Sequence, residues 1–138
     1  MSCQPTQSNL MEQRVNYIAR HEPTVKAFVD ETFDSDRVLD AIVQSDERLP
    51  LKGLLLGVKD IINVDQFSTR CGSVLPAHLF SGPQASCATR LFKAGAVMVG
   101  KTVTAEFAVS DPGPTRNPRN LNHTPGGSSS GSAAAVAA

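Results

Sequence analysis

The chain has 138 residues, of which 41% are hydrophobic and 19% are charged, and this composition excludes a disordered tail because it can supply a buried core. The length allows one modest domain. Thirteen basic residues balance thirteen acidic ones. The chain therefore lacks the net positive charge on which general binding to nucleic acids or membrane surfaces depends, and we expect neither partner.

The three cysteines, Cys3, Cys71 and Cys87, are widely spaced and include no Cys-x-x-Cys pair. This pattern fits neither a disulfide framework nor a zinc site, and it is typical of a reducing compartment. Residues 1–9 are polar and offer no signal segment, and no apolar run is long enough to cross a bilayer. We therefore expect a soluble, cytoplasmic protein.

The first third of the chain predicts a helix, a short strand and a second helix. Residues 9–22 carry apolar side chains at helical spacing, with Asn9 as a candidate cap. Pro23 is expected to end this helix, because the residue before a proline disfavours the helical conformation. Residues 25–29 alternate as in a strand, and Ser35 is expected to cap a second amphipathic helix.

The later elements alternate between apolar strands and helices, which favours the α/β class. Strands are predicted at 54–58 and 96–99, helices at 83–93, 104–108 and 133–138, and a long ordered loop at 110–127. The chain stops in the first turns of an apolar, alanine-rich helix. We therefore expect residues 1–138 to be the N-terminal part of a single larger α/β domain.

Residues 95–102, Gly-Ala-Val-Met-Val-Gly-Lys-Thr, match the phosphate-loop pattern G-x-x-x-x-G-K-[ST]. That pattern binds phosphate when a flexible loop lies between a strand and a helix. Here a predicted helix precedes Gly95, and the four middle residues are apolar strand formers. The context favours a helix end at Gly95 and a strand end at Gly100, so nucleotide binding is the last of the functional alternatives.

Residues 126–132, Gly-Gly-Ser-Ser-Ser-Gly-Ser, lead directly into the predicted C-terminal helix. Glycine permits a tight turn, and the free N–H groups at a helix N-terminus favour a developing negative charge. A flexible linker has a similar composition, but a linker seldom continues into Ala-Ala-Ala-Val-Ala-Ala. The run therefore indicates a turn that presents serine hydroxyls.

Lys59 directly follows the apolar run 54–58. Burying a lysine there costs free energy unless its amine is paired or takes part in a reaction. A neutral lysine can accept a proton from a hydroxyl, and apolar surroundings favour the neutral amine. The alternative is a lysine at a strand end whose amine reaches water. The serine-rich turn on the same chain favours proton transfer, and Asp60 is expected to be structural because it faces the opposite side of the strand.

Four sequence blocks resemble the N-terminal half of the amidase signature family. They are Leu-Gly-Val-Lys-Asp at 56–60, Thr-Arg-Cys-Gly-Ser at 69–73, Gly-Lys-Thr-Val-Thr-Ala-Glu-Phe-Ala at 100–108, and Asn-Pro-Arg-Asn at 117–120, which leads into residues 124–138. The match runs in order over about residues 25–138, after an N-terminal helix of about residues 1–24. The glycine-serine block with its alanine tail is the most specific part.

The resemblance implies an α/β/α fold with a mixed central sheet, here truncated before its core is complete. It also implies hydrolysis of the C–N bond of a linear carboxylic amide through a Ser–cis-Ser–Lys triad. By position, Lys59 would be the general base and Ser128 the bridging serine that follows a cis peptide bond. Ser129, Gly126 and Gly127 would support the site.

Two departures from the family pattern matter. The family's block commonly has glycine in its fifth place, where this chain has Ser130, and we treat this serine as a variant. The acylated serine of the family lies well after the bridging serine, which places it beyond residue 138. We therefore expect the 138 residues alone to be inactive.

The predicted protein is an amidase acting on a small-molecule amide, with the remaining C-terminal part of its domain as a partner. It needs no metal or organic cofactor, since hydroxyls and an amine suffice for the proton transfers. One alternative is the glutamine-hydrolysing subunit of a tRNA-dependent amidotransferase, which would need partner subunits. The other is a non-catalytic fragment or pseudoenzyme that acts by binding.

Overall fold

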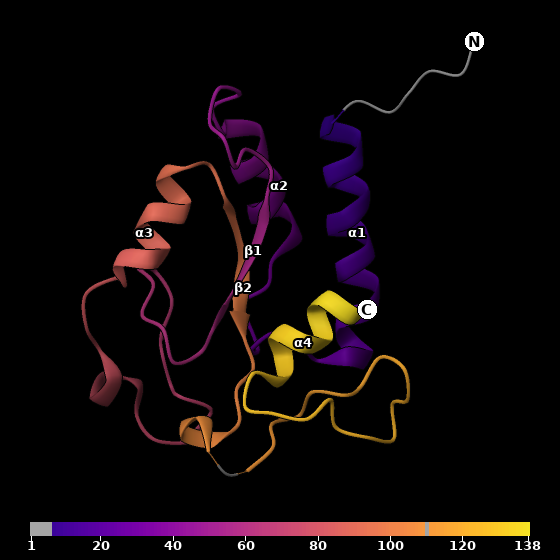
Figure 1. The fold of residues 1–138 in the computed structure, drawn as a ribbon, viewed down its shortest axis with the longest axis vertical. Coiled ribbons are helices and arrows are strands. Elements are labelled where there is room, and N and C mark those ends of the chain that lie inside the picture. The colour runs from indigo at the N-terminus through magenta and orange to yellow at the C-terminus, as the bar shows by residue number, and fades with distance from the viewer. Residues whose placement is uncertain (1–6, 110) are drawn as a thin grey trace.

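The computed structural model describes residues 7–109 and 111–138, and it shows strands packed between helices (Figure 1). Cys3 lies outside the described residues. The elements in chain order are α1 (Gln7–Val25), α2 (Ser35–Gln44), β1 (Leu55–Lys59), the short 3-10 helix η1 (Ala77–Phe80), α3 (Ser86–Lys93), β2 (Val97–Thr102), the 3-10 turn η2 (Glu106–Ala108) and α4 (Ser130–Ala137). The predicted α/β class is confirmed. None of the helices in the described part of the chain has the length and apolar character needed to cross a membrane.

The central sheet pairs β1 and β2 in parallel, with Leu55 opposite Val97 and Lys59 opposite Thr102. On the other side of β2, Phe28 forms an isolated antiparallel bridge to Thr102. The pairing is therefore mixed in direction, and β2 lies between its two neighbours. Because β1 and β2 are parallel, their carboxyl ends lie at the same end of the sheet. Lys59, the last residue of β1, is therefore close to the residues that follow β2.

The side chains of β2 alternate between two layers of helices. Val97 packs against buried residues of α1 and α2, and Val99 packs against Phe28 and Ala134 of α4. Met98 faces the other way and packs with Val58 and with Ala88 of α3. Figure 1 shows α3 on one side of the strands and α1 and α2 on the other. This period of two produces an α/β/α arrangement.

The predicted end of the first helix before Pro23 is wrong, because α1 continues to Val25. Pro23 lies in the last turn, and the Glu22 carboxylate accepts hydrogen bonds from the backbone N–H of Ala27 at 3.1 Å and of Phe28 at 2.8 Å. Burial raises the pKa of Glu22, and these two hydrogen bonds oppose that effect. Contacts to the following segment thus stabilise the helix end despite the proline.

Other predicted boundaries are corrected as well. The strand expected at 25–29 reduces to the single bridge at Phe28, because α1 occupies its first residue. Asn9 lies inside α1 rather than at its start. Asp34, not Ser35, caps α2 and accepts a hydrogen bond from the N–H of Arg37 at 2.8 Å.

The elements that surround the serine-rich turn also differ in detail from the prediction. The helix expected at 104–108 is only the turn η2, in which Phe107 has a φ of 49°. The C-terminal helix begins at Ser130, three residues before the predicted start. The apolar runs at 54–58 and 96–99 are confirmed as strands, with Lys59 as the last residue of β1. The expected strand end at Gly100 is wrong, because β2 continues to Thr102.

Candidate active site

The Lys59 amine lies between two serine hydroxyls of the glycine-serine run. Its Nζ donates to the Oγ of Ser128 at 2.7 Å and to the Oγ of Ser129 at 2.8 Å. Lys59 and Ser128 are half-buried, and Ser129 is exposed. The structure therefore brings together the three side chains that the sequence predicts for one site, at a distance suited to proton transfer.

The backbone before α4 holds Ser128 in place. The carbonyl of Ser128 accepts a hydrogen bond from the N–H of Ala105 at 2.9 Å. The Gly127–Ser128 peptide bond is cis, as the resemblance implies. Gly126 has a φ of +85°, a conformation that side chains disfavour. Gly126 and Gly127 thus shape the turn, and neither brings a functional group to Lys59.

The start of α4 packs directly against the segment that follows β2. The N–H of Gly131 donates to the carbonyl of Val103 at 2.9 Å, and a Cβ at this position would lie only 2.1 Å from the carbonyl oxygen of Ala27. Ser130 is buried, and its hydroxyl donates to the same Val103 carbonyl at 3.4 Å. A serine in the fifth place of the run is therefore accommodated, whereas the sixth place requires glycine.

A second hydroxyl pair joins α4 to β2. The Oγ1 of Thr102 and the Oγ of Ser132 lie 2.7 Å apart, and Thr102 is the partner of Lys59 in the strand register. Lys59 and α4 are therefore both fixed to the end of β2. Sequence reasoning missed this pair, because it depends on the register between the strands.

The phosphate-loop interpretation of residues 95–102 is wrong. Residues 97–102 form the buried strand β2, and Gly95, with a φ of +103°, lies in the turn after α3. Lys101 has an exposure of 0%, and its Nζ lies 2.9 Å from the Oδ1 of Asp60. Its amine is therefore occupied inside the protein and is not available to a phosphate group.

The ion pair of Asp60 and Lys101 is the main feature of this region that sequence reasoning missed. Asp60 is 1% exposed, which agrees with its predicted structural role on the opposite face from Lys59. Lys101 Nζ also donates to the Oγ1 of Thr69 at 2.8 Å. The signal that could have revealed Lys101 is the one used for Lys59, namely a lysine inside an apolar strand.

Cys71 lies in the turn next to Asp60. Burial raises the pKa of the Cys71 thiol, the nearby Asp60 carboxylate raises it further, and Lys101 opposes the shift. The thiol is therefore protonated at neutral pH and is a poor nucleophile. Cys71 and Cys87 are both free.

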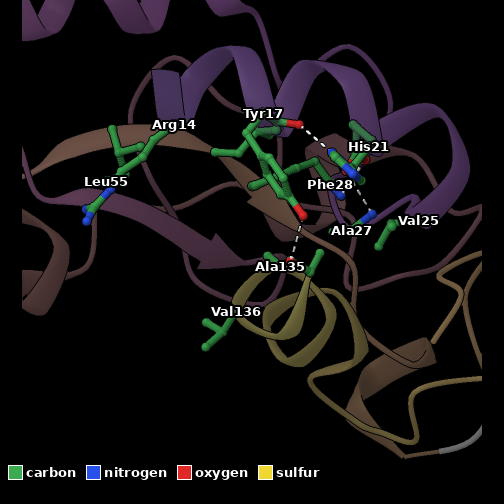
Figure 2. Close-up of a pocket in the computed structure, with 12 residues that line it drawn as sticks. Arg14, Tyr17, His21, Val25, Ala27, Phe28, Leu55, Ala135 and Val136 are labelled. Carbon is green, nitrogen blue, oxygen red and sulfur yellow. Dashed lines mark hydrogen bonds between the residues drawn. The ribbon is translucent and has the colours of Figure 1, made fainter. Parts of the chain in front are cut away.

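An apolar cavity of about 470 Å³ lies between α1 and α4, away from Lys59 and Ser128. Figure 2 shows Tyr17 reaching from α1 toward α4, where its hydroxyl donates to the carbonyl of Ala138 at 3.0 Å. The Tyr17 ring stacks on His21 with the ring centroids 3.9 Å apart. None of the residues predicted for the site lines this cavity, so it is separate from the Lys59 contacts.

Comparisons with known proteins agree on one family. The Amidase family profile matches residues 9–138. A glutamyl-tRNA(Gln) amidotransferase subunit from Synechococcus sp. (strain RCC307) is 41% identical over 138 residues, covering 92% of this chain and 28% of that protein.

Solved structures show the same likeness. The corresponding glutamyl-tRNA(Gln) amidotransferase subunit from Thermotoga maritima matches with a TM-score of 0.75 and 33% identity over 94% of this chain and 28% of that one. The peptide amidase of Stenotrophomonas maltophilia matches with a TM-score of 0.78 and 33% identity over 95% of this chain and 31% of that one. This chain thus spans less than a third of the length of these relatives.

Proposed function

This chain belongs to the amidase signature family, and we propose that it supplies the general base and the bridging serine for hydrolysis of a linear carboxylic amide. The observation that carries the proposal is the 2.7 Å contact between the Lys59 amine and the Ser128 hydroxyl. Lys59 stands at the end of a strand and Ser128 in a turn held by backbone hydrogen bonds. Both groups are therefore positioned before any substrate binds.

In the proposed mechanism the neutral Lys59 amine accepts the proton of the Ser128 hydroxyl. Ser128 takes a proton in turn from the hydroxyl of a nucleophilic serine, which attacks the amide carbonyl. The protons return along the same path to the leaving amine, and water then releases the acyl group. We place the nucleophile beyond residue 138, in the remaining part of the amidase domain. Ser129, 2.8 Å from the amine, orients Lys59 from the other side.

A second candidate within the family is the glutamine-hydrolysing component of an amidotransferase. The 41% identity to a glutamyl-tRNA(Gln) amidotransferase subunit favours it. In that case the substrate amide is the side chain of glutamine, and the released ammonia passes to partner subunits. Either reaction uses the same proton path. We place both in the cytoplasm, because the number and spacing of the cysteines are typical of a reducing compartment.

The test is the release of ammonia from glutamine and from small aliphatic and aromatic amides by the protein as its gene encodes it. We expect Lys59→Ala and Ser128→Ala each to lower kcat/KM by about 10³-fold or more, because each removes a step of the proton path. The matched control is Lys93→Ala, which removes an exposed lysine of α3 and should leave kcat/KM unchanged. A folded Lys59→Ala variant with near wild-type turnover would refute the proposal.

A further inference from the structure

A buried acid–base network lies beside the Lys59 site without touching its reacting groups. The side chains of Lys101 and Asp60 are 0% and 2% exposed, and their Nζ and Oδ1 atoms lie 2.9 Å apart. The Lys101 amine also donates to the Oγ1 of Thr69 at 2.8 Å and to the carbonyl of Ser68 at 3.4 Å. Two buried charges are costly to keep away from water, which raises the question of what the network does.

The first connection of the network is to Lys59. Asp60 is the next residue in the chain, and its backbone N–H donates to the carbonyl of Thr102 at 3.0 Å. The carbonyl of Lys59 accepts from the N–H of Ile62 at 2.9 Å. Since the Asp60 side chain is anchored on Lys101 in β2, the ion pair fixes the position along the sheet at which Lys59 leaves β1.

The second connection is to the segment that holds Ser128. The Oδ2 of Asp60 accepts from the N–H groups of Arg70 at 3.2 Å and Gly72 at 3.4 Å. Gly72 lies close to the segment that follows β2: a Cβ at residue 72 would be 2.7 Å from the carbonyl oxygen of Thr104. The following residue, Ala105, donates its N–H to the carbonyl of Ser128 at 2.9 Å.

We propose that Asp60 and Lys101 are positioning residues that set the distance between the Lys59 amine and the Ser128 hydroxyl. The inference rests on the proposed function. One carboxylate lies between the strand end that carries Lys59 and the segment that holds Ser128. Loss of the ion pair lets these two parts shift relative to each other, and a displacement of about 1 Å is enough to slow a reaction about 10²-fold.

The experiment compares kcat and KM in the protein as its gene encodes it. The double variant Asp60→Asn/Lys101→Met removes both charges at once, so no unpaired charge is left buried. We expect kcat to fall about 10²-fold with KM unchanged, because proton transfer depends on this distance and substrate binding does not. The matched control is Asp46→Asn/Arg48→Met, which neutralises an exposed pair with an N···O distance of 3.0 Å and should change neither constant.

Thermal unfolding of each variant separates a positioning role from a purely structural one. A double variant that retains wild-type kcat overturns the inference, and so does a loss of activity that equals the unfolded fraction. If the double variant does not fold, Asp60→Asn alone provides the test, since it keeps the shape of the side chain and removes the charge that pairs with Lys101; an unchanged kcat there overturns the inference. Lys59→Ala is measured in parallel, and full turnover in that variant would instead show that the proposed function has failed.

Discussion

Gly131 is a residue at which α4 approaches two earlier segments of the chain closely. A Cβ at this position would lie 2.1 Å from the carbonyl oxygen of Ala27 and 2.3 Å from the backbone nitrogen of Val103. Both are backbone atoms, so neither can rotate away as a side chain would. We expect Gly131→Ala to lower the free energy of unfolding by about 3 kcal/mol, the upper end for an overpacked core, measured by urea denaturation.

Gly126→Ala is the matched control for this clash. Gly126 has a positive φ of 85°, but nothing lies within 4 Å of its would-be Cβ. Its substitution should therefore cost only the strain of the left-handed conformation, about 1 kcal/mol. Equal losses of stability in the two variants would show that the close approach of α4 is not what demands glycine at residue 131.

At the scale of elements, the arginine of α2 covers part of the edge of β2. The Arg37 guanidinium donates to the carbonyls of Val99 at 2.7 Å and Met98 at 3.1 Å, and it lies 5.0 Å from the centroid of the Phe67 ring. We expect Arg37→Ala to lower the free energy of unfolding by about 2 kcal/mol, because carbonyls of the buried strand lose a charged donor. Urea denaturation provides the measurement.

Arg48→Ala provides the comparison for Arg37. Arg48 is also an arginine paired with an oxygen, at 3.0 Å from Asp46, but its side chain is 87% exposed. Exposed pairs of this kind add little to stability, so the variant should unfold at the urea concentration of the wild type. A loss as large as that of Arg37→Ala would mean that the contacts to β2 are not the reason for the effect.

The two strands could be predicted from the sequence because short apolar runs are a local signal. The end of α1 could not, since it depends on the Glu22 carboxylate accepting hydrogen bonds from Ala27 and Phe28. Local rules assign the residue before Pro23 to an extended conformation, and the contacts of the folded chain override them. The turn η2 replaces a predicted helix for the same reason, because the N–H of Phe107 donates instead to the carbonyl of Cys71.

The residues of the candidate site also fall into those that could be predicted from the sequence and those that could not. Lys59 and Ser128 could be named from the sequence because they stand in distinctive motifs. Asp60 and Lys101 are nearly as close together as that pair, with 2.9 Å between Nζ and Oδ1, yet their contact depends on strand register. Lys101 also stands in a phosphate-loop pattern, which suggests a phosphate group rather than Asp60 as its partner. A motif shows which side chains can react, whereas the fold shows which ones hold them in place.

At the scale of the whole molecule, the sheet is open on one side. β1 pairs with β2, and in the described part of the chain no strand pairs with the other edge of β1. Unpaired edges of this kind readily accept another strand. We propose that a further strand of the amidase domain pairs with this edge, in keeping with relatives more than three times as long as this chain.

In the proposed mechanism Lys59 and Ser128 move protons while another hydroxyl carries the acyl group. The most direct test is to treat the protein, as its gene encodes it, with an activated ester, quench in acid and map the acylated residue by mass spectrometry of its peptides. We predict a single acyl group on a serine beyond residue 138, and none when Lys59 is replaced by alanine. Stoichiometric acylation of Ser128 or Ser129 would contradict this mechanism, because one of these serines would then be the nucleophile.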